Sequence, residues 1–179
     1  MPHAVHTAAA ATLLGRSAGR PPGRGFTLLE LMAVVAIVAI LALMTLPSFL
    51  DTIIRNQILE ALPLADIARK PIDASWAATR TFPADNAAIG LPQPDKVVSN
   101  LVSAMVVEDG VIRLTFGNRA NGLIKGKALT LRPAVVEDAP VVPIAWVCGY
   151  APAPEKMTVH GENRTTVPQR YLPWKCRAS

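Results

Sequence analysis

The sequence of 179 residues contains few of the side chains from which catalytic and metal sites are built. It has two cysteines and three histidines, and its carboxylates do not cluster. A zinc site needs several histidine or cysteine ligands, and a catalytic triad needs a base beside its nucleophile. The composition therefore disfavours most enzyme classes, and we expect neither catalysis nor a bound cofactor or metal.

Charged residues are scarce as well, at 17% against 51% hydrophobic residues, which is apolar for a soluble domain. The net charge of +5 owes much to Arg16, Arg20 and Arg24, because no acid accompanies them in the first 25 residues. Subtracting these three from the 18 basic residues leaves 15 against 13 acidic ones, so the remainder is nearly neutral. Nucleic-acid binding through bulk basicity is therefore disfavoured, and a membrane segment is the first feature to seek.

One apolar run stands out, from Leu31 to Leu50, twenty residues without a charge. This is about the length that a helix needs to cross the hydrocarbon core of a bilayer. Arginines precede the run, and the next basic residue after it is Arg55. The positive-inside rule therefore places the N-terminus in the cytoplasm and everything after Asp51 outside.

Helical periodicity continues beyond the apolar run. Apolar residues recur at helical spacing at Ile54, Ile58, Ala61, Leu62 and Ala65. We predict one long helix from Phe26 to about Thr79, apolar all round at first and amphipathic later. Three residues lack the N–H that a helix interior needs, so each is expected to kink or break it: Pro47, Pro63 and Pro71.

The second half of the chain alternates with a period of two, which indicates strands. The first predicted strand places Val102, Ala104 and Val106 on one face, and a turn follows at Glu108-Asp109-Gly110. The next three strands place on one face Ile112, Leu114 and Phe116; Leu129 and Leu131; and Ile144, Trp146 and Cys148. No clear period is visible after Gly149.

These patterns predict an α+β fold, in which a long N-terminal transmembrane and amphipathic helix packs on a four-stranded antiparallel sheet. The amphipathic half of the helix would cover the apolar face of the sheet. Residues 1–25 have the composition of a processing segment, 26–50 form the apolar helix and 51–80 its amphipathic half. Residues 81–179 hold a proline-rich loop, the sheet and the C-terminal region.

The segment Arg24-Gly25-Phe26-Thr27-Leu28-Leu29-Glu30 contains a physical oddity, because Glu30 lies in an otherwise apolar helix. A charge at the centre of a bilayer helix costs about 2.5–3.5 kcal/mol, and less near the interface, so the acid needs a reason. Cleavage between Gly25 and Phe26 would create an α-amine that Glu30 can pair with, in the same chain or in a neighbour.

Gly25 to Glu30 and the apolar helix after them resemble the cleavage and methylation signature of type IV prepilins. The resemblance implies that a prepilin peptidase cuts after Gly25 and methylates the new N-terminus at Phe26. It also implies that Glu30 sets the register of an incoming subunit and that the helix loosens around Pro47 in assembled filaments. The alternative is an uncleaved signal anchor, or a signal peptide cut nearby.

The end of the chain is similar to that of type IVa pilins. Ile144-Ala-Trp-Val-Cys148 and Tyr171-Leu-Pro-Trp-Lys-Cys176 match the strand and the C-terminal segment that a disulfide joins in that family. Both Cys148 and Cys176 would lie on the external side, where disulfides persist, and two cysteines allow one intramolecular pairing. Two unpaired buried thiols are the alternative.

The resemblance implies a structural subunit of a type IV pilus, with adhesion, twitching motility and DNA uptake as its roles. The implied partners are further copies of the chain, the prepilin peptidase, the inner-membrane assembly machinery, and a host surface or DNA. The subunit would wait in the inner membrane and then form an extracellular filament. A minor pilin, a pseudopilin of type II secretion and a membrane-tethered enzyme or binding domain are the alternatives.

Two further features have more than one interpretation. Trp76, Trp146 and Trp174 are either ligand-stacking platforms or, as we expect, packing residues. Five basic residues near the C-terminus form either a solvated surface or a contact with DNA, an anionic surface or a neighbouring subunit: Lys156, Arg164, Arg170, Lys175 and Arg177.

Overall fold

A computed structural model describes residues 25–139 and 141–178, except for the side chains of residues 44–48. The chain separates into two compact units, Met1–Ala42 and Leu43–Ser179. Of the first unit, only residues 25–42 are described. The predicted leader therefore lies outside the described residues, apart from Gly25.

The first helix, α1 (Leu28–Ala61), begins two residues later than the sequence pattern suggests. Thr27 explains the difference, because its Oγ1 accepts a hydrogen bond from the backbone N–H of Glu30 at 3.2 Å. A threonine in this position satisfies one of the free N–H groups at a helix start. Among the helices of the described residues, none combines the length and the hydropathy of a membrane span.

Prolines affect the helix less than the sequence predicts. Helix α1 continues through Pro47, whose side chain lies outside the described part. At Pro63 the chain tightens into one 3₁₀ turn, η1 (Leu62–Ala65), and then continues as α2 (Asp66–Thr79). The expected break at Pro71 is wrong, because α2 runs through it. Proline removes one backbone donor, but the buried face on both sides of it holds the helix on the sheet.

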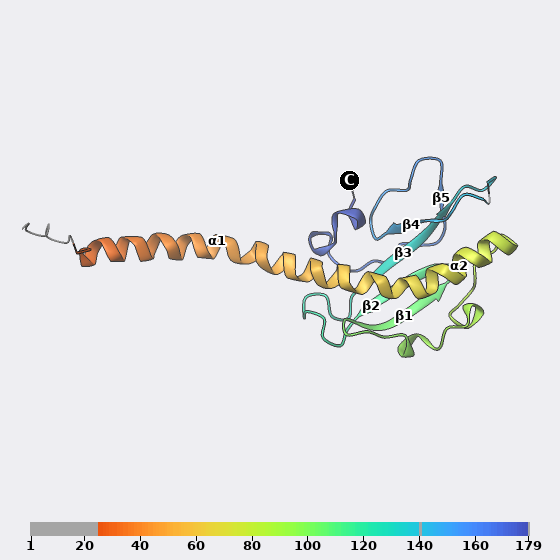
Figure 1. The fold of residues 1–179 in the computed structure, drawn as a ribbon, viewed down its shortest axis with the longest axis horizontal. Coiled ribbons are helices and arrows are strands. Elements are labelled where there is room, and N and C mark those ends of the chain that lie inside the picture. The colour runs from red at the N-terminus through yellow and green to blue at the C-terminus, as the bar shows by residue number, and fades with distance from the viewer. Residues whose placement is uncertain (1–24, 140, 179) are drawn as a thin grey trace, which may run out of the picture. The chain divides into compact units, whose positions relative to one another are not determined.

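The sheet has the strand order β1-β2-β3-β4 and is antiparallel throughout (Figure 1). The strands are β1 (Val102–Glu108), β2 (Val111–Phe116), β3 (Ala128–Val135) and β4 (Ala145–Cys148). A fifth strand, β5 (Thr158–Val159), pairs with β3. The four-stranded prediction missed β5 because two residues are too few to show a period. Four short 3₁₀ helices complete the described elements: η2 (Ala87–Ile89), η3 (Pro94–Lys96), η4 (Gln169–Tyr171) and η5 (Trp174–Cys176).

Strand β1 faces the core with different residues from those predicted. Val102 is buried, but further along the strand Met105 and Val107 are buried in place of Ala104 and Val106. The pairing with β2 shifts register between Val102 and Ala104, so one extra residue enters β1 there. A β-bulge of this kind changes which side chains point to each face, and a simple alternation cannot reveal it.

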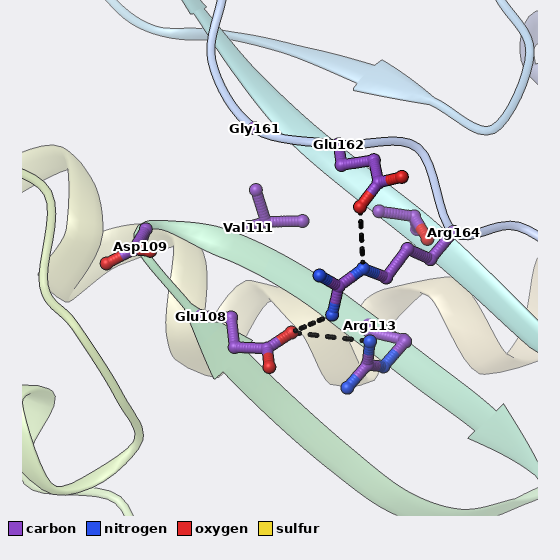
Figure 2. A pocket seen from close by; sticks show the side chains of 8 residues that line it. Glu108, Asp109, Val111, Arg113, Gly161, Glu162 and Arg164 are labelled. Carbon is purple, nitrogen blue, oxygen red and sulfur yellow. Dashed lines mark hydrogen bonds and ion pairs between the residues drawn. The ribbon is translucent and has the colours of Figure 1, made fainter.

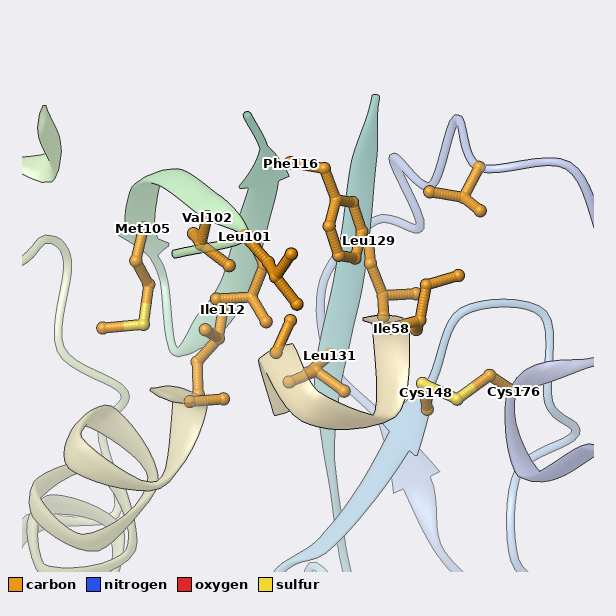
Figure 3. Close-up of a cluster of buried hydrophobic side chains, with 14 of the residues drawn as sticks. Ile58, Leu101, Val102, Met105, Ile112, Phe116, Leu129, Leu131, Cys148 and Cys176 are labelled. Atoms are coloured by element: carbon orange, nitrogen blue, oxygen red, sulfur yellow. A yellow bond between two sulfur atoms is a disulfide. The ribbon is translucent and has the colours of Figure 1, made fainter. Parts of the chain in front are cut away.

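The core of the second unit lies between the helices and one face of the sheet (Figure 3). The helices contribute residues at helical spacing, all at most 1% exposed: Ile54, Ile58, Ala61, Ala65, Ala68 and Ile72. The sheet contributes the predicted faces of β2 and β3, fully buried: Ile112, Leu114, Phe116, Leu129 and Leu131. Cys148 belongs to the same core, and Ile144 and Trp146 pack against it, as predicted.

Candidate functional site

The segment before α1 is open to solvent. Phe26 is 79% exposed. A methyl group added to Gly25 would meet no atom within 4 Å. None of the described residues covers the peptide bond between Gly25 and Phe26.

Glu30 lies in the first turn of α1, three residues after Thr27. Its backbone N–H is bound to Thr27, whereas its carboxylate has no partner among the described residues and is exposed. A negative charge near a helix N-terminus is favoured by the helix dipole, and it is free to accept a further hydrogen bond. The geometry thus leaves one carboxylate available in the first turn of α1.

The described side chains of α1 in the first unit are exposed on every side of the helix. At least 47% of each of the following is exposed: Leu28, Leu29, Leu31, Met32, Val34, Val35, Ile37, Val38, Ile40 and Leu41. A helix that is apolar all round is stable only when it is buried by a bilayer or by other chains. The predicted span from Leu31 to Leu50 includes residues 44–48, whose side chains lie outside the described part.

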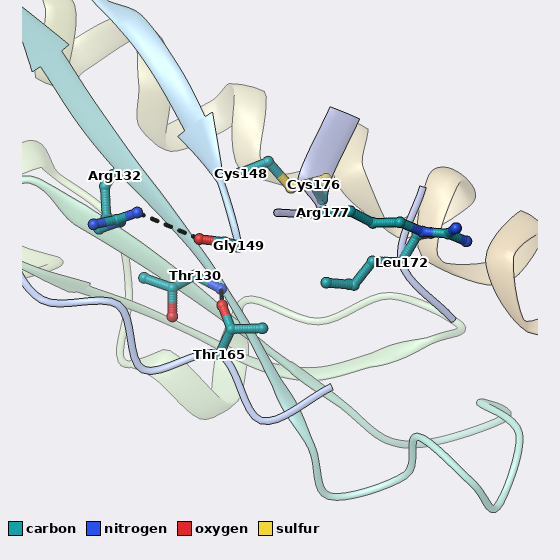
Figure 4. The surroundings of a disulfide bond; sticks show 8 residues. All are labelled: Thr130, Arg132, Cys148, Gly149, Thr165, Leu172, Cys176 and Arg177. Carbon is teal, nitrogen blue, oxygen red and sulfur yellow. Dashed lines mark hydrogen bonds between the residues drawn. A yellow bond between two sulfur atoms is a disulfide. The ribbon is translucent and has the colours of Figure 1, made fainter. Parts of the chain in front are cut away.

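A disulfide joins Cys148, at the end of β4, to Cys176 in η5 (Figure 4). The Cα atoms are 4.6 Å apart, and both residues are buried. This confirms the pairing that the sequence suggested. Gly149 follows with a φ of +55°, and a Cβ there would lie 2.9 Å from the carbonyl oxygen of Cys176. The close approach therefore requires glycine after Cys148.

Hydrogen bonds also join α1 to the C-terminal segment that the disulfide holds. The Arg177 Nε donates to the carbonyl oxygen of Leu172 at 2.7 Å. The guanidinium groups of Arg177 and Arg55 both donate to the carbonyl oxygen of Arg170, at 3.0 and 3.1 Å. Sequence analysis missed the role of Arg55, because its partner is a backbone oxygen 115 residues away.

A cluster of ion pairs lies at the hairpin formed by β1 and β2, beside residues 161–164 (Figure 2). The Glu108 carboxylate pairs with Arg113 at 3.3 Å and with Arg164 at 3.1 Å, and Arg164 also pairs with Glu162 at 3.0 Å. These two carboxylates raise the pKa of Arg164, chiefly through its hydrogen bond to Glu162. The groups neutralise one another around a hollow of about 170 Å³ and do not form a nucleophile–base pair.

The tryptophans divide into two classes. Trp76 stacks on Phe82 with the ring centres 4.6 Å apart, and Arg69 lies 5.7 Å above the ring of Trp146. Both are packing residues, as expected. Trp174 is 76% exposed and contributes little to the core. Over the described residues, no group of three or more histidines, cysteines and carboxylates is arranged to hold a metal ion.

Asn86 has a structural role that the hydrophobic pattern of the sequence did not reveal. It is 5% exposed and lies beside β1, the edge strand. Its Oδ1 accepts a hydrogen bond from the N–H of Val107 at 2.6 Å, and its Nδ2 donates to the carbonyl oxygen of Met105 at 3.0 Å. The side chain thus pairs backbone groups that a free edge would expose.

Comparison with known proteins gives two family matches. The model of the family described as "Pilin (bacterial filament)" matches residues 55–177, and that of the prokaryotic N-terminal methylation motif matches residues 22–46. A type IV major pilin protein, PilE1, of Neisseria gonorrhoeae is 31% identical over 160 residues, covering 86% of this chain and 87% of the relative.

Two further relatives come from other organisms. A fimbrial protein of Neisseria meningitidis serogroup A is 35% identical over 127 residues, 70% of this chain and 72% of the relative. The fimbrial protein EcpC of Eikenella corrodens is 31% identical over 159 residues, 86% of this chain and 90% of the relative. The two family models together include the start of α1 and both cysteines of the disulfide.

Proposed function

The chain belongs to the pilin family, and on that premise we propose that it is a structural subunit of a type IV pilus filament. The observation that carries this proposal is the exposed apolar part of α1, joined to a unit with its own core and disulfide. Removing one large apolar side chain from water stabilises by about 1.5–3 kcal/mol, so outside the bilayer such a helix needs to be packed against copies of itself.

Processing comes first in this proposal. A prepilin peptidase removes residues 1–25 by cutting after Gly25 and methylates the new N-terminus at Phe26. The match of residues 22–46 to the methylation motif and the exposure of Phe26 support this step. The Glu30 carboxylate then pairs with the N-terminal amine of a neighbouring subunit and fixes its register, because an unpaired charge in an apolar core is costly.

The helix divides by function. Residues 26–50 hold the subunit in the inner membrane and later pack in the filament core, where the segment around Pro47 loosens. Residues 51–80 form the amphipathic half that covers the sheet, and residues 81–179 form the surface of the filament. The burial of the core from Ile54 onward supports this boundary.

The subunit acts by assembly and not by catalysis. The inner-membrane pilus machinery builds it into an extracellular filament, whose roles are adhesion, twitching motility and DNA uptake, with host surfaces or DNA as contacts. Filament assembly converts one exposed apolar helix per subunit into a shared core, which is a mechanical function that needs no cofactor.

The mass and N-terminal sequence of protein sheared from cells test this proposal. We expect an abundant species that begins at N-methylated Phe26 and is two daltons lighter than the reduced chain. A chain that retains residues 1–25 would contradict the processing step. A processed form found only in membranes would favour a minor pilin or a pseudopilin.

The register role of Glu30 has its own test. Glu30→Ala should reduce sheared filaments strongly, whereas Glu60→Ala, an exposed acid later in α1, should leave them unchanged. Normal filaments from the Glu30→Ala chain would remove the register role while leaving the subunit function in place.

A further inference from the structure

In the part of the chain that the structure describes, one end of the second unit carries basic side chains that form no ion pair with an acid. The guanidinium groups of Arg55 and Arg177 both donate to the carbonyl oxygen of Arg170. Lys175 lies between Arg170 and Arg177 in the sequence. Among the described residues, none of these four forms an ion pair with a carboxylate. This basic end therefore has charge available for a partner.

Trp174 projects from the same segment. It is 76% exposed, and the Lys175 ammonium lies 5.3 Å from the centre of its ring. Tyr171, Leu172 and Cys176 around it are buried, so the segment itself is firmly held. Tryptophan exposed on a fixed segment is the residue type that most often anchors protein interfaces.

An apolar hollow of about 330 Å³ lies between the loop after α2 and the outer side of β1. Most of its lining is apolar: Ala84, Ala87, Leu91, Pro92, Val106 and Val107. Two acids line the same hollow, but Glu108 is already paired with Arg113 and Arg164. Among the described residues, Asp85 forms no ion pair, so it is the acid available to a basic partner. The hollow has room for one indole ring, with negative charge beside it.

The hollow and the basic end lie far apart on the unit. Arg55 and Gln57 mark the basic end, where Gln57 accepts a hydrogen bond from the N–H of Asn121. The hollow adjoins Ala84, whose carbonyl oxygen accepts from Asp109, at the end where Phe82 stacks on Trp76. Some twenty residues of helix separate the two ends, or roughly 30 Å.

We propose that Trp174 of one subunit inserts into this hollow on a second copy of the chain, with Lys175 and its basic neighbours facing Asp85. This inference rests on the filament function proposed above and names a contact between its subunits. A knob at one end and a socket at the other make a heterologous contact, which continues from copy to copy and does not close into a dimer. Charge complementarity of the two surfaces fixes the direction of the contact.

Photo-crosslinking in sheared filaments of the full chain tests the contact directly. Benzoylphenylalanine in place of Trp174 should crosslink to residues 84–94 or 106–108 of another copy, as mapped by mass spectrometry. The same probe in place of Val141, which is 88% exposed and outside both surfaces, is the control. Crosslinks from position 174 that fall elsewhere on the neighbour would overturn the contact.

Assembly of variants gives the second test. Trp174→Ala should lower the filament yield at least about tenfold, as expected for loss of an anchoring aromatic residue. Val141→Ala should leave the yield unchanged. Lys175→Glu should lower the yield, and adding Asp85→Lys in the same chain should restore it. The intact disulfide and an unchanged melting temperature establish that each variant is folded.

The outcomes separate the contact from the subunit function. Absence of processed filaments from the unchanged chain would contradict the subunit function itself. Filaments that form normally with Trp174→Ala would overturn the contact alone. If that variant assembles normally but no longer binds duplex DNA, the basic end belongs to DNA and the contact is overturned.

Discussion

At the scale of single residues, buried polar groups do the most to define the second unit. Asn86 joins the loop after α2 to the edge of β1 through bonds to Val107, Met105 and Pro92. A lone asparagine in a loop gives no signal of its partners in the sequence. The cysteine pairing was predictable, because two cysteines outside the membrane allow one intramolecular bond.

Asn86→Ala should lower the free energy of unfolding by about 2–3 kcal/mol, since it leaves buried backbone groups without partners. Asn121→Ala is the control, because the Asn121 Oδ1 also accepts a hydrogen bond from a backbone N–H, that of Leu123, but in an exposed turn, and it should cost less than about 1 kcal/mol. Urea unfolding of both variants measures the difference. Equal losses would mean that Asn86 contributes no more than a surface residue.

Asp73 should make stability depend on pH. Burial raises the pKa of its carboxyl group and outweighs the lowering effects of Trp146 and Arg69. A raised pKa means that the folded state binds the proton more tightly, so stability falls as pH rises from about 4 through the folded-state pKa.

Asp73→Asn removes this loss, so the variant should gain stability relative to the unchanged chain at neutral pH and lose that advantage in acid. Melting temperatures between pH 3 and pH 8 measure it, and exposed Asp138→Asn controls for the removal of one charge. A constant difference between Asp73→Asn and the unchanged chain across this range would show that the Asp73 carboxyl is not perturbed.

At the scale of elements, regular periodicity was predictable and local irregularity was not. The faces of β2 and β3 agree with the alternation in the sequence, and so does the buried face of the helices. The face of β1 was predicted wrongly because of one inserted residue, and β5 was missed because of its length. Pro63 lies in the 3₁₀ turn η1 that separates α1 from α2, as the sequence predicted, whereas α2 runs through Pro71, where burial on the sheet outweighs a lost hydrogen bond.

The bulge in β1 depends on Gly117. A Cβ at this position would lie 2.4 Å from the Cβ of Ser103, which sits in the bulge. Gly117→Ala should therefore destabilise the fold by about 1–3 kcal/mol, the usual cost of overpacking. A Cβ at Gly122 would meet no atom within 4 Å, so Gly122→Ala should leave the stability nearly unchanged.

Adding Ser103→Gly to Gly117→Ala should recover most of the loss, because it removes the atoms that clash. Thermal unfolding of the single and double variants forms the cycle that measures this coupling. If Ser103→Gly gives no recovery, strain at Gly117 arises from another neighbour.

At the scale of the whole molecule, the chain combines a unit with a core and a segment without one. The second unit buries its helices against the sheet from Ile54 onward. The described side chains of α1 before Ala42 are exposed. The charge-free run from Leu31 to Leu50 and the motif at Gly25–Glu30 were both visible in the sequence. The sequence could not predict the hollow beside β1, because residues from the loop and the strand meet only in the folded chain.

A fragment of residues 52–179 should fold as a soluble, disulfide-bonded monomer, because it retains every residue of the core. A fragment of residues 60–179 is the matched control. It lacks the buried Ile54 and Ile58, and it should lose about 3–6 kcal/mol or fail to fold. Gel filtration and thermal unfolding after expression in an oxidising compartment measure both. Aggregation of the longer fragment would show that the apolar segment contributes to its fold.

The disulfide between Cys148 and Cys176 has a consequence for resistance to proteases. Between the two cysteines the chain leaves the sheet after β4 and returns to it at β5, and residues 152–156 of this stretch are exposed. A protease that cuts once there leaves both products joined through the bridge, with the last residues still bonded to Arg55 and β4. Release of the cut end requires reduction as well as cleavage. A nicked subunit would therefore keep both ends of the cut chain in place at the surface of the cell.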